Sequence, residues 1–209
     1  MRLFQILLFF ILFHFAFISF ISAQTTWDKQ TLEKANTAKD AAYLNKEEKL
    51  VLFYCNLVRL DPQLFATTYA KKYIDSVGQT DGYTKSLLKT LKTTKAMEAL
   101  LPSEKLFEFA RTHATDFGKK GKVGHGNFKK RFAKYSASCT CDIAENCEYG
   151  PDKAFDIVMA LLVDENVSDL GHRKNILNPE YKNCDTAIRP HKKFRWNCVM
   201  DFSSDSKIQ

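Results

Sequence analysis

The chain lacks the short motifs that mark many enzymes. It contains no His-Glu-x-x-His, no Gly-x-Ser-x-Gly, no phosphate-binding loop and no Walker-type lysine. Beyond residue 23 it has no apolar run long enough to span a bilayer. It also has only four histidines there, at positions 113, 125, 172 and 191. These absences favour no particular enzyme class, and they restrict acid–base or metal chemistry at histidine to a few positions.

The first 23 residues have the layout of a secretory signal peptide. Arg2 precedes an almost continuous apolar run from Leu3 to Ile21, and small Ser22-Ala23 precedes polar Gln24. We therefore predict cleavage here and a secreted or extracytoplasmic protein with no transmembrane segment in the mature chain. An uncleaved membrane anchor is the alternative, because the run is near the lower length limit for crossing a bilayer.

The mature chain is basic. Lys and Arg number 31 against 24 Asp and Glu, and only Arg2 lies in the leader, so a net charge of about +6 remains. No nucleic-acid-binding motif accompanies the lysines, which argues against a nucleic-acid partner for an exported chain. We expect an extracellular partner such as a lipid, a glycan or an anionic envelope polymer. For the charge itself, plain solubility is the favoured explanation, and a surface that faces such a partner is the alternative. Short basic clusters recur at Lys119-Lys120, Lys129-Lys130-Arg131 and His191-Lys192-Lys193.

An even number of cysteines in an exported chain favours disulfide bonds. All six lie outside the leader, at Cys55, Cys139, Cys141, Cys147, Cys184 and Cys198. Cys184 and Cys198 flank a predicted hairpin, so they are the first pair we expect to be bonded. A metal cluster around Cys139, Cys141 and Cys147 is the less favoured alternative.

The order of the expected elements is helices first and then a hairpin, which predicts an α+β fold. Residues 24–45 are polar and are expected to form a linker or arm, and residues 204–209 a C-terminal tail. Between them, Asn45 and Glu48 predict a helix start, and Asp61-Pro62 a helix end. Further helices are expected over 64–74, 85–97, from 103, after Gly150-Pro151 and over 172–177, and strands over 185–189 and 194–202. Residues 118–149 show no clear period.

Four polar residues stand out as candidates for chemistry. His125 lies between two glycines, and His172 follows Gly171, so both could point into a cleft. Glu165 falls on the inner face of the apolar helix expected after residue 151, where it needs a polar partner, unless the helix ends there and Glu165 reaches solvent. His113 lies on the apolar stripe of its own helix, which favours a buried, hydrogen-bonded histidine.

Several segments, in this order, resemble the CAP superfamily of cysteine-rich secretory, allergen-antigen and pathogenesis-related proteins. Residues 144–150 are similar to its Gly-Glu-Asn motif, and 161–165 to its Trp-x-x-Glu segment, with Ala144 and Leu162 as departures. Residues 171–177 are similar to the Gly-His-Arg-x-Asn-Ile-Leu segment of bacterial SCP-like members. Asn56 to Arg59 resembles the early Asn-x-x-Arg helix, and 197–202 the last strand. The resemblance covers residues 46–203.

The resemblance implies a three-layer α-β-α sandwich with a small antiparallel sheet between helices. It also implies a cleft tetrad of His125, Glu145, Glu165 and His172, supported by Asn146, Asn175 and His113. Such donors suit Zn²⁺ or another divalent cation. We expect a non-enzymatic binding protein. A metal-assisted hydrolase or peptidase acting on envelope polymers, and a disulfide-stapled interaction module, are the alternatives.

Overall fold

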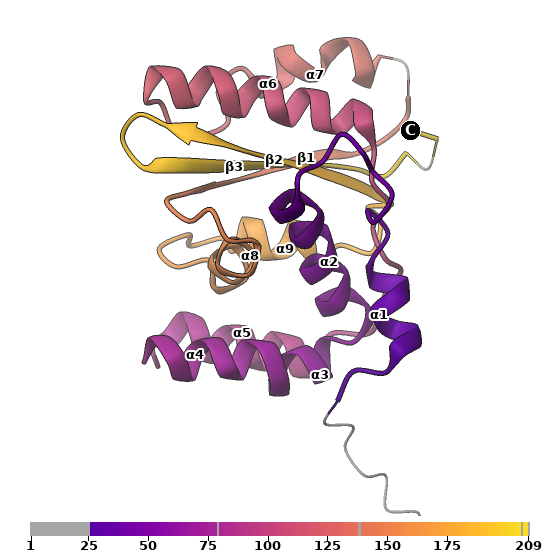
Figure 1. The fold of residues 1–209 in the computed structure, drawn as a ribbon, viewed down its shortest axis with the longest axis vertical. Coiled ribbons are helices and arrows are strands. Elements are labelled where there is room, and N and C mark those ends of the chain that lie inside the picture. Colours follow the sequence, from indigo (N-terminus) through magenta and orange to yellow (C-terminus); the bar gives the residue numbers. More distant parts are fainter. Residues whose placement is uncertain (1–25, 79, 138, 206, 209) are drawn as a thin grey trace, which may run out of the picture.

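The computed structural model describes residues 26–209 apart from 79, 138, 206 and 209. One antiparallel sheet consists of the strands β1 (Ile143–Tyr149), β2 (Asn183–His191) and β3 (Arg195–Ser203), in the spatial order β1-β3-β2. Helices α6 (Glu104–Lys120) and α7 (Phe128–Ser136) cover one face of this sheet (Figure 1). The other face packs on α2 (Lys46–Leu60), α8 (Ala154–Val163) and α9 (Gly171–Ile176). This arrangement confirms the predicted α-β-α sandwich.

A further row of helices lies beyond α8 and α9 (Figure 1). It consists of α3 (Pro62–Phe65), a π-helical turn (Ala66–Ala70), α4 (Lys71–Val77) and α5 (Gly82–Thr93). The helix predicted over 85–97 corresponds to α5, which starts earlier, at Gly82, and ends at Thr93. After it the chain runs extended to the edge of β2, where Leu101 N donates to Lys182 O at 2.9 Å and Cys184 N to Leu101 O at 3.0 Å.

The local signals at the start and end of α2 are confirmed. The Asn45 side chain accepts from Glu48 N at 3.0 Å, and the Glu48 carboxylate accepts from Asn45 N at 2.9 Å. At the other end, Pro62 begins α3, and Asp61 caps it by accepting from Leu64 N. The start of α2 and the break between α2 and α3 thus follow directly from the residue types at these positions.

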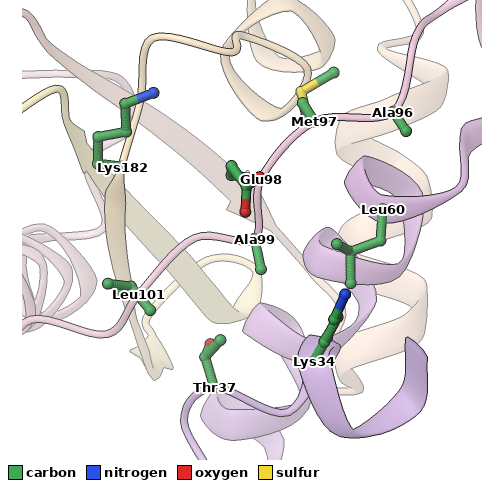
Figure 2. A pocket seen from close by; sticks show the side chains of 9 residues that line it. All are labelled: Lys34, Thr37, Leu60, Ala96, Met97, Glu98, Ala99, Leu101 and Lys182. Atoms are coloured by element: carbon green, nitrogen blue, oxygen red, sulfur yellow. The ribbon is translucent and has the colours of Figure 1, made fainter. Parts of the chain in front are cut away.

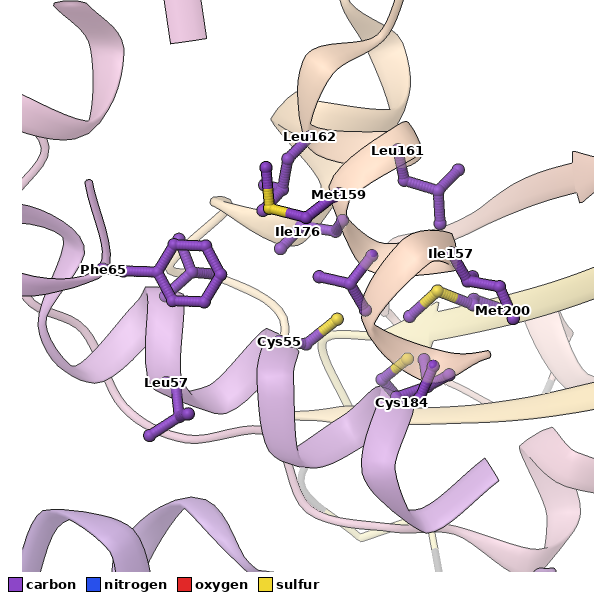
Figure 3. Packing of buried hydrophobic residues seen from close by; sticks show 14 of the residues in the cluster. Cys55, Leu57, Phe65, Ile157, Met159, Leu161, Leu162, Ile176, Cys184 and Met200 are labelled. Atoms are coloured by element: carbon purple, nitrogen blue, oxygen red, sulfur yellow. The ribbon is translucent and has the colours of Figure 1, made fainter. Parts of the chain in front are cut away.

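The larger hydrophobic core lies between the sheet and helices α2 and α8 (Figure 3). Helix α8 is apolar most of the way round and buries seven of its ten residues, while Asp156 is exposed. A second cluster, including Phe107, Ala110 and Val199, joins α6 to the opposite face of the sheet. The labelled side chains of Figure 3 are those of Cys55, Leu57, Phe65, Ile157, Met159, Leu161, Leu162, Ile176, Cys184 and Met200.

Asn56 and Arg59 of α2 hold separate segments together. Arg59 is fully buried, and its guanidinium donates to the carbonyls of Glu98, Ile176, Asn178 and Tyr181 at 2.8–3.1 Å. Asn56 bonds both the N–H and the carbonyl of Leu100. Burial lowers the pKa of Arg59 to about 10. The Asn-x-x-Arg pattern is therefore structural in this chain.

Three segments differ from the sequence-based expectation. Residues 29–35, expected in a polar arm, form helix α1 (Lys29–Ala35), and Ala35, Ala38 and Leu44 are buried. Asn56 bonds Ala35 O at 3.0 Å, so a core residue fixes this segment. Residues 118–149, which show no clear period, contain α7 and β1. In the expected tail, Ile208 packs with Phe132 and Tyr135.

The expected signal peptide, residues 1–23, lies outside the described residues. Among the helices that the structure does describe, none has both the length and the apolar character needed to cross a membrane.

Candidate functional site

The edge strand β1 positions the candidate site. Glu145 and Cys147 are two residues apart, so their side chains point to the same face of the sheet, toward α6. Asn146 points to the other face, where its Nδ2 donates to His172 O at 3.1 Å and its Oδ1 accepts from Asn175 Nδ2 at 2.8 Å. One short strand therefore supplies polar groups to both sides of the sheet edge.

Four possible metal donors converge on the α6 side of β1. His125 Nδ1 donates to Glu145 Oε1 at 3.0 Å, and His113 Nε2 lies 3.8 Å from the same oxygen. Cys147 Sγ lies 3.7 Å from Glu145 Oε1 and 3.8 Å from His125 Nδ1. Donor atoms of His113, Glu145 and Cys147 all lie within 4.8 Å of one another, and these three residues are buried. We call His113, His125, Glu145 and Cys147 the donor cluster.

Three residues of the donor cluster, His113, Glu145 and Cys147, have donor atoms close enough to one another to hold a tetrahedral cation. Metal–ligand bonds of about 2.0–2.3 Å place neighbouring donor atoms about 3.3–3.8 Å apart. An imidazole nitrogen, a carboxylate oxygen and a sulfur are donors that Zn²⁺ accepts, and His125 lies beside them with its Nδ1 3.0 Å from Glu145 Oε1. The residues present therefore fit such an ion.

Arg131 of α7 is the cation that Glu145 contacts now. Arg131 Nη2 donates to both carboxylate oxygens, at 2.8 and 2.7 Å, and also to His125 O at 2.9 Å. Burial would raise the pKa of Glu145, but the hydrogen bond from His125 and the charge of Arg131 outweigh it and lower that pKa. Glu145 is thus an ionised carboxylate in a buried position.

The other two buried donors are neutral in this arrangement. Burial lowers the pKa of His113, whose Nε2 donates to Gly124 O at 3.0 Å. Burial, together with the charge of Glu145, raises the pKa of the Cys147 thiol well above its ordinary value. Cys147 is therefore a thiol that becomes a thiolate only if a cation replaces its proton.

Asp201 of β3 lies directly opposite Glu145 in the β-ladder and is fully buried. Neither of its carboxyl oxygens, nor Arg131 Nη1 close by, has a hydrogen-bond partner among the described residues. Burial and the charge of Glu145 raise the pKa of Asp201 well above its ordinary value. The raised pKa keeps a proton on Asp201, and its interaction with the ionised Glu145 is one cause of that rise.

His172 belongs to a second group, on the α8–α9 side of β1. Its Nδ1 donates to Asp164 Oδ1 at 2.7 Å, and Asp164 Oδ2 accepts from Arg173 N at 3.1 Å. Asp164 ends α8 in the left-handed conformation, with φ of 58°, which turns its carboxylate back toward α9. The two groups meet at the sheet edge, where a cavity of about 430 Å³ is lined by His125, Glu145, Val167, Asp169, Gly171, His172, Lys174 and Asn175.

Residues 52–199 match the family described as the cysteine-rich secretory protein family, CAP. The chain belongs to the CAP family. No curated protein and no solved structure matches the chain.

The CAP domain brings together three of the four residues expected in the tetrad. His125, Glu145 and His172 line one cavity, with the supporting residue Asn175. Glu165 instead lines a separate cavity with Tyr83, because α8 ends before it. Of the other supporting residues, Asn146 links His172 to Asn175, and His113 joins the donor cluster.

The expected Cys184–Cys198 disulfide is wrong. In the hairpin of this CAP domain, Cys184 is opposite Phe202 and Cys198 is opposite Ile188, four positions further along β2. At about 3.3 Å per residue the two cysteines are about 13 Å apart along the hairpin, too far for a bond. Cys139 is bonded to Cys141, while Cys55, Cys147, Cys184 and Cys198 are buried thiols.

The sequence interpretation missed Asp164 and Arg131, and it considered Cys147 as a metal ligand only together with Cys139 and Cys141. Cys147 follows Glu145 by two positions in a strand, so alternation alone could have placed both on one face. No local signal relates Arg131 to Glu145, since the two meet only through the packing of α7 against β1.

A larger cavity, of about 650 Å³, lies away from the donor cluster between α1, the end of α2 and the extended segment 96–101 (Figure 2). Leu60, Met97 and Leu101 give it apolar walls. Lys34 and Lys182 lie on either side of the extended segment (Figure 2). The lining therefore combines apolar side chains with two lysines and one carboxylate, that of Glu98.

Proposed function

We propose that this CAP protein is a secreted, non-enzymatic binding protein that holds a divalent cation, Zn²⁺ foremost, at the donor cluster. The observation that carries the proposal is the convergence of His113, His125 and Cys147 on Glu145 at 3.0–3.8 Å. The apolar leader and the Cys139–Cys141 disulfide support export. Residues 171–177 support the bacterial SCP-like type.

The extracellular ligand of this proposal is a lipid or a glycan. The cavity of Figure 2 supports a lipid, because apolar side chains line it and its two lysines outnumber the one carboxylate, that of Glu98. A cation at the donor cluster would have a structural role or would orient the neighbouring cavity through His125, whose side chain is 52% exposed. A bound cation would supply charge stabilisation there.

A metal-assisted hydrolase is the second candidate. The partly exposed His125 at the mouth of the 430 Å³ cavity favours it, because a substrate could approach the donor cluster from that side. Cys147 does not serve as its nucleophile, since the thiol is buried and its pKa is raised. Hydrolysis of peptide or envelope polymer that disappears on chelation and returns with metal would favour this candidate over pure binding.

Calorimetry of Zn²⁺ binding to the oxidised, secreted protein tests the proposal. We expect saturable binding that Cys147→Ser and His113→Gln each weaken strongly. His172→Ala is the matched control, because His172 lines the same cavity but is bonded to Asp164 outside the donor cluster. Folding of each variant is verified by circular dichroism.

Co²⁺ gives an independent readout of the ligands. A thiolate-to-metal charge-transfer band is expected with the wild type and with His172→Ala, and its loss is expected with Cys147→Ser. Absence of binding in a folded wild type would overturn the metal assignment. Loss in His172→Ala with retention in Cys147→Ser would return the site to the tetrad expected from the sequence.

A further inference from the structure

Two segments distant in the sequence form one tip of the molecule. Lys192 N donates to Gly118 O at 2.9 Å, and His191 Nε2 donates to Lys122 O at 2.8 Å. The turn between β2 and β3 therefore lies beside the end of α6, at one end of the sheet (Figure 1). We call residues 118–123 and 190–195 together the basic tip.

The basic tip concentrates positive charge. Neither of its segments contains an Asp or a Glu. One acidic residue of α6, Asp116, is paired with Lys120 at 2.8 Å. The cations of the tip are all exposed, namely Lys119, Lys120, Lys122, Lys192, Lys193 and Arg195.

Two apolar side chains are exposed among these cations. Val123 is 56% exposed and Phe194 is 43% exposed, and they are two of the four large hydrophobic residues exposed in the described part of the chain. Phe194 is held in place by ring contacts with Tyr149 and His191, at centroid distances of 5.7 and 5.2 Å. The Tyr149 hydroxyl in turn accepts from Gly124 N at 2.8 Å. These contacts therefore hold the exposed Phe194 side chain in place at the surface of the basic tip.

We propose that the basic tip docks on the surface of an anionic lipid bilayer. The lysines and Arg195 match the negative headgroups in charge, and Val123 and Phe194 match the interfacial region beneath them. A soluble polyanion would use the cations but would leave the two apolar side chains in water. The combination of both features therefore favours a membrane surface. None of the tip residues is a donor of the proposed metal, so this inference stands independently of it.

Vesicle co-sedimentation of the protein recovered from secretion tests the inference, with phosphatidylcholine vesicles prepared with and without phosphatidylserine. We expect binding only to the vesicles with phosphatidylserine, and binding that weakens as NaCl is raised. The double variant Lys192→Ala/Lys193→Ala should lose about 30-fold in affinity, roughly fivefold for each lysine. Phe194→Ser should also weaken binding, while keeping its dependence on salt.

The matched control is Lys89→Ala/Lys92→Ala. It removes the same charge from exposed positions of α5, in the helix row farthest from α6 (Figure 1). If the tip and α5 variants lost equal vesicle affinity, net charge alone would explain the binding and the inference would be overturned. Equal binding to both kinds of vesicle would also overturn it. So would unchanged vesicle binding in the tip variant together with loss of binding to a sulfated glycan, which would make the tip a glycan site.

Discussion

The guanidinium of Arg131 forms a hydrogen-bonded ion pair with the carboxylate of Glu145, with Nη2 at 2.8 and 2.7 Å from the two oxygens. Glu145 is also the residue on which the other donors converge, so Arg131 and a bound cation would compete for one carboxylate. A neighbouring unit charge at partly buried sites changes binding by about 1–2 kcal/mol or more. We therefore expect Arg131→Gln to raise Zn²⁺ affinity by about tenfold, measured by calorimetry.

Arg111→Gln is the control for this prediction, because Arg111 is exposed on α6 and paired with Glu108 away from the donor cluster. Its Zn²⁺ affinity should equal that of the wild type. A lower affinity in Arg131→Gln would contradict the prediction and would show that Arg131 positions Glu145 for the metal.

Arg59 should be one of the most sensitive positions in the fold. Arg59→Met would leave four carbonyl groups without this donor, namely those of Glu98, Ile176, Asn178 and Tyr181. An unsatisfied buried polar group costs about 1–3 kcal/mol, so we expect the free energy of unfolding to fall by about 3 kcal/mol or more. Arg59→Lys should give an intermediate loss, since an ammonium cannot reach four carbonyls as a planar guanidinium does.

Urea unfolding followed by circular dichroism measures these losses. Arg111→Met removes an exposed arginine of similar size and should change stability by less than about 0.5 kcal/mol. A similarly small change in Arg59→Met would show that water replaces the guanidinium at the carbonyls.

Much of the fold could be predicted because its signals are local. The Asn45–Glu48 capping box, the Asp61-Pro62 break and the alternation around the β2–β3 turn each depend on residues close in sequence. The donor cluster could not be predicted in the same way. His113 and Cys147 meet only because α6 packs on the face of the sheet to which β1 turns its odd-numbered side chains.

The position at which α8 ends decides which carboxylate forms a hydrogen bond with His172. The apolar pattern of α8 extends far enough to put Glu165 on its inner face. The backbone instead leaves the helix at Asp164, in a left-handed conformation, and Asp164 rather than Glu165 reaches His172. The exact end of a helix depends on the conformation of single residues, which composition does not determine.

Gly118 is required where α6 meets the hairpin. A methyl group at this position would lie 2.2 Å from Pro190 O, a backbone atom that cannot move aside as a flexible side chain would. We expect Gly118→Ala to lower the free energy of unfolding by about 1–3 kcal/mol. Gly82→Ala is the control, because nothing lies within 4 Å of the added methyl group. It should leave stability within about 1 kcal/mol of wild type, with any change in the stabilising direction. Equal effects of the two variants in thermal and urea unfolding would contradict the close contact.

Asp185 predicts an unusual dependence of stability on pH. Its carboxylate accepts from Tyr43 Oη at 2.7 Å, Ser103 N at 3.0 Å and Thr186 N at 2.8 Å. Burial nevertheless outweighs these bonds and raises the pKa of Asp185 to about 7. In the unfolded chain the same group titrates near its ordinary pKa of about 4. Between these values the native state holds a proton that the unfolded state has lost.

The contribution of Asp185 to stability should therefore be fully present below about pH 4 and should be lost as the pH rises to about 7. Its slope is at most about 1.4 kcal/mol per pH unit. Asp185→Asn removes the titration, and any change in hydrogen bonding that it introduces is independent of pH. The free energy of unfolding of wild type minus that of Asp185→Asn, measured in urea at several pH values between about 4 and 8, should decrease steadily and then level off. A difference that stays constant over this range would show that Asp185 is ionised throughout, and that its three hydrogen bonds outweigh its burial.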